Sequence, residues 1–241
     1  MKLYGLLGKK LSHSFSSNFF NAYFLENQIA AEYKNFELKQ IDDVSNVFEL
    51  KPQGLNVTIP YKEKIIPYLD DLDEVAHKIR AVNTICFDGT RKIGRNTDVV
   101  GFKRMIQPFL TSKHERAVIF GTGGASKAVA YVLEQIGIDV VFISRKPCRE
   151  RNIFSYSDIN ENMLRSCKLL INTTPVGMYP KEMEVIKLPF TELNEEHLVV
   201  DLIYNPEQTL FLKRARENGA EVLNGSSMLK EQALESWRLW N

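Results

Sequence analysis

A lysine and an aspartate in the first half of the chain have the side chains best suited to acid–base chemistry. Lys62 ends the segment Asn56–Lys62, in which polar residues follow an apolar run and Pro60 interrupts strand pairing. Asp98 ends the segment Gly94–Asp98. A lysine beside an alcohol or ketone can transfer a proton or stabilise a developing oxyanion, and a carboxylate can orient a substrate hydroxyl. Because the two residues are far apart in the chain, only folding could bring them together.

The sequence leaves open which of the two groups carries the proton. The ordinary pKa of a lysine is high for a base at neutral pH, so burial or a cationic neighbour would have to lower it. A nearby carboxylate acts on that pKa in the opposite direction, so Asp98 has the alternative role of orienting the substrate. It also has a structural alternative, as the cap of the helix predicted to run toward Leu110.

Two other polar segments in the first half accompany this pair. Ser12–Ser17 is a hydroxyl-rich loop after the first predicted strand, and its structural alternative is the N-cap of a helix. Asn83 lies within the predicted strand Val82–Phe87. We count both segments as candidates for orienting a substrate.

A glycine-rich loop in the second half has the context of a dinucleotide site. Gly121–Ser126 follows the apolar strand Ala117–Gly121, opens the helical stretch Ala125–Ile136 and precedes the strand Val140–Ser144. Glycines there allow a tight turn and let backbone N–H groups approach a pyrophosphate at the positive end of the helix. Ser126 stands where the GxGxxG pattern has its third glycine, so the prediction depends on the context more than on the letters.

The end of the second strand in this unit predicts which dinucleotide binds. An NAD site usually has an aspartate or glutamate there for the ribose hydroxyls. The segment Ser144–Arg149 has no carboxylate and carries Arg145, Lys146 and Arg149. Such a cluster suits the 2′-phosphate of NADP, which arginine can hold with two hydrogen bonds. A solvated basic loop is the structural alternative.

The composition of the chain indicates which classes of binding partner to expect. The formal net charge is +1, from 31 basic and 30 acidic side chains, which gives no reason to expect a nucleic acid or an anionic membrane. Cys86, Cys148 and Cys167 have neither disulfide nor metal-ligand spacing, and no stretch is apolar enough for a membrane span. We expect a cytoplasmic protein, monomer or homodimer, with a small-molecule substrate and no bound metal.

Short apolar runs alternate with helical patterns along the chain, which predicts an α/β fold with mainly parallel sheets. The length of 241 residues allows two domains. We place residues 1–98 in a substrate domain and residues 99–225 in a Rossmann-type, doubly wound domain. Spacing alone does not assign the last helix, 226–241, to either. The other predicted helices and strands are Leu3–Gly8, Ser16–Asn27, Glu32–Glu37, Asp43–Leu50, Gly54–Thr58, Asp71–Ile79, a short strand near Ile93, Leu169–Asn172 and Val199–Leu202.

The order of these motifs resembles that of the shikimate dehydrogenase family over nearly the whole chain. The matching segments are Ser14-x-Ser16, Asn56–Lys62, Ala81–Thr84, Asn96–Asp98, Gly121–Ser126, Asn172–Met178, Asp201–Pro206 and Gly225–Leu229 with Gln232. The resemblance implies reversible reduction of 3-dehydroshikimate to shikimate with NADPH. It also implies that a cleft separates the two domains and that the C-terminal helix packs back on the first.

The resemblance assigns a role to each matching position. It implies that Lys62 and Asp98 are the catalytic pair. The residues implied to contact the substrate are Ser14, Ser16, Thr58, Asn83, Tyr204 and Gln232. Those implied to contact the cofactor are Gly121, Gly123, Gly124 and Ala125 at the pyrophosphate, Ser144, Arg145 and Arg149 near the adenosine phosphate, and Leu202 and Gly225 at the nicotinamide.

The sequence departs from the family pattern at a few positions. Ser17 replaces a proline, Thr122 replaces an alanine, and Ser144 and Lys146 flank the arginine where asparagine and threonine are common. Three alternatives stay open. They are a quinate or quinate/shikimate dehydrogenase that uses NAD, a non-catalytic nucleotide-binding regulatory protein on the same scaffold, and a methylene-tetrahydrofolate-type dehydrogenase, which ranks low because no pterin-binding signature is evident.

Overall fold

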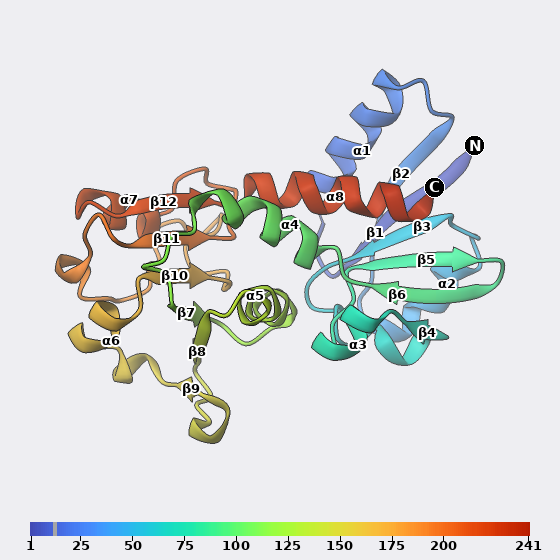
Figure 1. Cartoon of the computed structure of the whole chain (residues 1–241). Coiled ribbons are helices and arrows are strands. Elements are labelled where there is room, and N and C mark those ends of the chain that lie inside the picture. Colours follow the sequence, from blue (N-terminus) through green and yellow to red (C-terminus); the bar gives the residue numbers. More distant parts are fainter. Residues whose placement is uncertain (12–13) are drawn as a thin grey trace. The chain divides into compact units, whose positions relative to one another are not determined.

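Two six-stranded sheets, one in each of two units, organise the protein (Figure 1). The computed structural model describes residues 1–11 and 14–241, so Ser12 and His13 of the hydroxyl-rich loop lie outside the described residues. Unit 1 contains residues 1–101 and 229–241, and unit 2 contains residues 102–228. The chain therefore begins and ends in unit 1.

The sheet of unit 1 is mixed, with more parallel than antiparallel pairs. Its strands are β1 (Lys2–Gly8), β2 (Ala31–Glu37), β3 (Gly54–Val57), β4 (Asp71–Leu72), β5 (Thr84–Asp88) and β6 (Arg91–Arg95), in the order β2-β1-β3-β5-β6-β4. β1 pairs in parallel with β2 and β3, and β4 with β6. β5 is antiparallel to both β3 and β6. It is antiparallel to β6 because the turn at Gly89 (φ 59°) reverses the chain directly from one strand into the other.

Polar caps and packing define the helices of unit 1. They are α1 (Phe15–Glu26), α2 (Val44–Phe48), α3 (Glu74–Ile79), the start of α4 (Asp98–Ile106) and most of α8 (Ser226–Trp240). α3 begins at Glu74 because the Asp73 side chain accepts a hydrogen bond from the Ala76 N–H at 2.7 Å. The helix predicted from Asp71 was therefore wrong at its start, where Asp71 instead belongs to β4.

An aromatic cluster fixes α8 on the sheet of unit 1. Tyr4 of β1 lies 5.4 Å from Trp237 and 5.1 Å from Trp240 between ring centroids, and Phe20 of α1 lies 5.5 Å from Trp240. The indole N–H of Trp240 donates to the Ile85 carbonyl at 3.1 Å. A Cβ on Gly54 would lie 2.4 Å from the indole, so the close packing of this ring requires glycine in β3.

Unit 2 has a fully parallel, doubly wound sheet. Its strands are β7 (Arg116–Phe120), β8 (Asp139–Ile143), β9 (Ile153–Phe154), β10 (Leu169–Asn172), β11 (Leu198–Asp201) and β12 (Glu221–Asn224), in the order β12-β11-β10-β7-β8-β9. Every neighbouring pair is parallel. The order reverses between β7 and β10, which is where dinucleotides bind in this topology. The predicted α/β class with two mainly parallel sheets is confirmed.

The helices of unit 2 are α5 (Gly124–Gln135), α6 (Glu161–Ser166), α7 (Leu210–Glu217) and the end of α4. The 3-10 turns of the two units are Ile41–Asp43, Ile66–Tyr68, Gln107–Phe109, Arg149–Arg151, Tyr156–Asp158 and Phe190–Glu192. Within the described ranges, no helix combines the length and apolar character needed to cross a bilayer.

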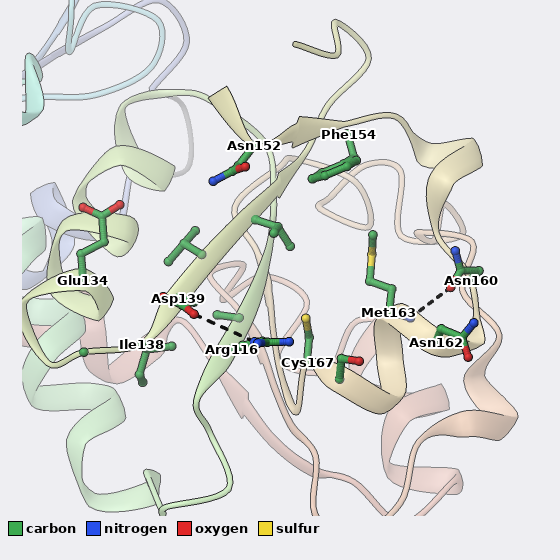
Figure 2. Close-up of a pocket in the computed structure, with 15 residues that line it drawn as sticks. Arg116, Glu134, Ile138, Asp139, Asn152, Phe154, Asn160, Asn162, Met163 and Cys167 are labelled. Carbon is green, nitrogen blue, oxygen red and sulfur yellow. Dashed lines mark hydrogen bonds and ion pairs between the residues drawn. The ribbon is translucent and has the colours of Figure 1, made fainter. Parts of the chain in front are cut away.

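A short connection between β8 and β9 leaves a hollow beside the sheet of unit 2. Residues 144–152 link these parallel strands with a 3-10 turn, where parallel crossovers usually contain an α-helix. A hollow of about 820 Å³ lies beside β8, β9 and α6, and Figure 2 shows Phe154, Met163 and Cys167 around it. None of the site residues predicted from the sequence lines this hollow.

Candidate active site

Lys62 and Asp98 form a close ion pair within unit 1. Lys62 Nζ lies 2.6 Å from Asp98 Oδ2, and the two side chains are 15% and 6% exposed. Lys62 follows β3, and its carbonyl accepts a hydrogen bond from the Val82 N–H at 2.8 Å, which fixes its backbone beside β5. Asp98 is the first residue of α4, where the helix dipole favours a carboxylate. The fold thus brings together two residues whose contact could not be predicted from the sequence alone.

Asn83 holds the other oxygen of the Asp98 carboxylate. It lies directly before β5, one residue outside the strand in which it was predicted, and is 2% exposed. Its amide donates to Asp98 Oδ1 at 2.9 Å, and its own Oδ1 accepts from the Thr97 N–H at 2.7 Å. The carboxylate is therefore oriented by Asn83 on one side and by Lys62 on the other.

Gln232 of α8 joins the same group from the other end of the chain. Asn83 Nδ2 lies 3.4 Å from Gln232 Oε1, and Gln232 Nε2 donates to the Leu229 carbonyl at 2.9 Å. The side chain is 6% exposed. The fold brings four of the predicted residues together, with an ammonium, a carboxylate and two amides. Such a group can bind a polyhydroxylated ligand and hold a proton beside it.

The contacts of Ser14, Ser16 and Thr58 are with other residues of unit 1. Ser14 is the N-cap of α1 and accepts a hydrogen bond from the Ser17 N–H at 3.3 Å, which was its structural alternative. Ser16 is buried, and burial raises the pKa of Tyr33 well above its ordinary value, although the Ser16 hydroxyl acts in the opposite direction. Thr58 is half-buried, and its methyl would lie 2.8 Å from a Cβ on Gly8. A substrate contact at these three residues stays a prediction.

The glycine loop of unit 2 is shaped for close approach by a ligand. Gly121 has φ 110°, and a Cβ there would lie 2.6 Å from Thr173 Oγ1 of the loop after β10. Gly123 is the N-cap of α5 and is exposed, and a Cβ there would meet no atom within 4 Å. The buried Ser126 hydroxyl donates to the Gly123 carbonyl at 2.6 Å, which explains why serine fits where the pattern has a third glycine.

The basic cluster follows β8 as the sequence predicted. Arg145, Lys146 and Arg149 are exposed, and Ser144 Oγ accepts from the Lys146 N–H at 3.2 Å, which shapes the turn. Arg149 lies 3.4 Å from Asp158, which lowers the pKa of that carboxyl, although two bonds from Ser155 lower it more. A 2′-phosphate would find guanidinium groups here without an acidic residue at the strand end.

Leu202 and Gly225 lie against each other at the ends of β11 and β12. A Cβ on Gly225 would meet the Leu202 carbonyl oxygen at 2.1 Å, so this approach requires glycine. Ala125 is half-buried in the first turn of α5. Tyr204 is half-buried in the loop after β11 and belongs to unit 2. Contacts of these residues with a cofactor or substrate stay predictions.

Sequence reasoning missed three buried polar residues behind the predicted ones. Asp201 accepts hydrogen bonds from Asn172 at 3.0 Å, the Ile203 N–H at 3.1 Å and Thr209 at 2.7 Å. Thr97 and Ser236 lie within the unit 1 site at 1% and 0% exposure. Asp201 ends an apolar run and Ser236 comes one helical turn after Gln232, and those two signals could have found them.

Comparison with known proteins points to one family. Residues 6–85 match the family model described as the shikimate dehydrogenase substrate binding domain. The shikimate dehydrogenase (NADP(+)) of Clostridium botulinum strain Hall is 37% identical over 246 residues, which cover 98% of this chain and 95% of the relative.

Solved structures resemble this chain over its whole length. A crystal structure of shikimate dehydrogenase from Aquifex aeolicus has a TM-score of 0.89 and 33% identity, covering 100% of this chain and 92% of the other. Quinate dehydrogenase from Corynebacterium glutamicum, in complex with NAD, has a TM-score of 0.86 and 29% identity, covering 100% and 93%.

Proposed function

This chain belongs to the shikimate dehydrogenase family, and we propose on that premise that it catalyses the reversible reduction of 3-dehydroshikimate to shikimate with NADPH. The observation that carries this proposal is the buried contact between Lys62 and Asp98, oriented by Asn83. A non-catalytic nucleotide-binding protein would have no use for an ammonium and a carboxylate held in this way, because burying charged groups costs free energy.

Lys62 and Asp98 have different proposed roles at the substrate. NADPH, when bound, supplies the hydride that reduces the carbonyl carbon to an alcohol. Lys62 holds a proton at Nζ, where it can pass to the carbonyl oxygen or stabilise the negative charge that develops there. Asp98 accepts a hydrogen bond from a substrate hydroxyl and keeps the Lys62 ammonium in position. In the reverse direction, the same groups take the proton from the alcohol.

The remaining polar residues of the site are proposed to bind the substrate. Asn83 and Gln232 offer amide donors and acceptors beside Asp98. Ser14, Ser16, Thr58 and Tyr204 offer hydroxyl groups for the carboxylate and hydroxyls of the ligand. Their number suits a small, highly oxygenated acid, because each ligand hydroxyl needs a partner when it leaves water.

The residues of unit 2 are proposed to hold NADP. Gly121, Gly123, Gly124 and Ala125 would accept the pyrophosphate at the first turn of α5, beside its exposed N-cap. Ser144, Arg145 and Arg149 would bind the adenosine phosphate, and Leu202 with Gly225 would lie at the nicotinamide end. We also propose a cytoplasmic location, which rests on the three widely spaced cysteines.

Initial rates measured by the absorbance of the reduced nicotinamide test this proposal. Four assays combine shikimate or quinate with NADP or NAD. We expect the highest kcat/KM with shikimate and NADP. A preference for quinate and NAD would instead support the activity for which the Corynebacterium glutamicum neighbour is named. Binding of NADP without turnover of either acid would support the regulatory alternative.

A further inference from the structure

A serine on the last helix lies at the centre of the buried hydrogen bonds of unit 1. Ser236 is 0% exposed. Its hydroxyl oxygen lies 2.9 Å from Asn56 Nδ2, 2.8 Å from Thr84 Oγ1, 3.1 Å from Thr97 Oγ1 and 3.0 Å from the Gln232 carbonyl oxygen. Its partners come from β3, β5, the start of α4 and α8 itself.

The hydrogen-bonding capacity of this hydroxyl is fully used. A serine hydroxyl donates one hydrogen bond and accepts two. Donation to the Gln232 carbonyl is the local bond that serine often makes within a helix. Its two acceptor positions then remain for the Asn56 amide and for a threonine hydroxyl. Ser236 therefore links the helix to the sheet through its acceptor positions.

The partners of Ser236 lead directly to the proposed catalytic pair. The Thr97 N–H donates to Asn83 Oδ1 at 2.7 Å, and Asn83 donates to Asp98 Oδ1 at 2.9 Å. Gln232 comes one turn before Ser236, so both side chains lie on the same face of α8. Asn83 contacts Gln232 at 3.4 Å. A rotation or shift of α8 would thus disturb Gln232 directly and Asp98 through Thr97 and Asn83.

Apolar packing alone does not fix that register. The aromatic contacts of Trp237 and Trp240 hold α8 on the sheet, but apolar burial has little directional preference, and the hydrogen bond from the Trp240 indole to the Ile85 carbonyl is made by the last residue of the helix. Hydrogen bonds do have a directional preference. We propose that Ser236 is a positioning residue, which sets the register of α8 on β3 and β5 and so places Gln232 and Asp98 for the reaction. This inference rests on the proposed function.

Replacement of the hydroxyl separates positioning from simple stability. In Ser236→Ala, the Asn56 amide keeps Thr84 Oγ1 at 3.0 Å and the Asn83 carbonyl at 3.2 Å, so it retains acceptors. We expect the kcat/KM for shikimate to fall roughly 10- to 100-fold, as small misplacements of reacting groups do. The KM for NADP should stay unchanged, because the residues proposed to bind NADP belong to unit 2.

Val44→Ala is the matched control. Val44 is 0% exposed in a separate apolar cluster of unit 1 with Leu38 and Val47. It should lower the thermal midpoint without changing the kcat/KM for shikimate. If Ser236→Ala lowers only the thermal midpoint, as this control does, Ser236 is merely structural and the inference fails.

A second variant decides the matter if Ser236→Ala does not fold. Thr97→Val keeps the shape of the side chain but removes its hydroxyl both from Ser236, at 3.1 Å, and from the Asn83 amide, at 3.0 Å. It should reduce the kcat/KM for shikimate in the same direction. Where both single variants fold, the effects of the two changes should not add, because they interrupt one network. An unchanged kcat/KM in Thr97→Val overturns the inference. Absence of shikimate turnover in the wild-type protein would instead overturn the proposed function.

Discussion

The two units build their proposed sites in different ways. In unit 1, side chains distant in sequence meet, as in the bonds from Asn83 to Gln232, 149 positions away, and from Asn56 to Ser236, 180 positions away. In unit 2, the single short segment 121–126 forms the proposed pyrophosphate loop, and Ser126 contacts Gly123 only three positions away. A site made from one segment depends on local backbone geometry, whereas a site made from distant segments depends on the completed fold.

This difference can be tested by changes that should affect one unit and leave the other intact. Both tryptophans of the chain, Trp237 and Trp240, belong to unit 1, so tryptophan fluorescence reports on that unit. Amide hydrogen exchange in β10 and β11 reports on unit 2.

The largest effect is expected at Lys62. Lys62→Ala removes the group proposed to hold the proton at the substrate, and turnover should fall by about two to four orders of magnitude. Calorimetric titration with NADP should give the wild-type affinity, because the residues proposed for the cofactor lie in unit 2. Turnover equal to the wild type would remove Lys62 from the proposed mechanism.

A change in the aromatic cluster should destabilise unit 1 alone. Trp240→Ala leaves a cavity against Tyr4 and Gly54 and removes the hydrogen bond to the Ile85 carbonyl. We expect a loss of about 3 kcal/mol in the free energy of unfolding. The fluorescence of Trp237 in denaturant measures it. Equal loss of exchange protection in β10 and β11 would contradict independent behaviour of the two units.

A buried carboxyl should make the stability of unit 2 fall as the pH rises. Burial raises the pKa of Asp201 to about 6, against the effect of its hydrogen bonds from Thr209, Ile203 and Asn172. The folded protein then binds this proton more tightly than the unfolded chain, whose carboxyl titrates near pH ~4. The free energy of unfolding therefore falls as the pH rises from about 4 to about 6, by about 3 kcal/mol for this group, and the loss is complete above that range.

Asp201→Asn removes this titration and keeps the side-chain size. Exchange protection of β10 and β11, compared between variant and wild type across the same pH range, isolates the contribution of this group. The difference should shift in favour of the variant as the pH rises. Parallel pH profiles for the two proteins would show that Asp201 has no such effect.

The smallest effect is expected at the basic cluster. Arg145→Ala should raise the KM for NADP about tenfold, the equivalent of one charge-assisted hydrogen bond, and leave the KM for NAD unchanged. Lys187→Ala removes an exposed cation elsewhere in unit 2 and serves as the control. Equal effects of Arg145→Ala on both cofactors would contradict phosphate recognition at this position.

The sequence predicted the buried parallel strands more closely than the short edge strands. Leu169–Asn172 was predicted at its observed bounds because three apolar residues are followed by one buried amide. β4 and β9 have two residues each, too few for any periodic pattern, and neither was predicted. The start of α3 was missed because Asp73, rather than Asp71, supplies the cap.

The residues of the candidate site also differ in how well the sequence predicts their positions. The turn before α5 could be predicted from residues 121–126 because its geometry is local. The contact between Lys62 and Asp98 required β3, β5 and α4 to be in place, and periodicity contains no information about that pairing. Ser236 was missed because its one signal in the sequence, the position one helical turn after Gln232, does not show which residues of other elements it contacts.

The packing of α8 also determines the order in which a ribosome could complete the two units. Residues 102–228 are synthesised before Gln232, Trp237 and Trp240, so every residue of unit 2 exists before unit 1 is complete. Tyr4, Phe20 and Phe24 are made early but find their indole neighbours only after Trp237 and Trp240 have been synthesised. Until then this aromatic surface is uncovered, and a polypeptide released too early would lack Gln232 while still containing the whole of unit 2.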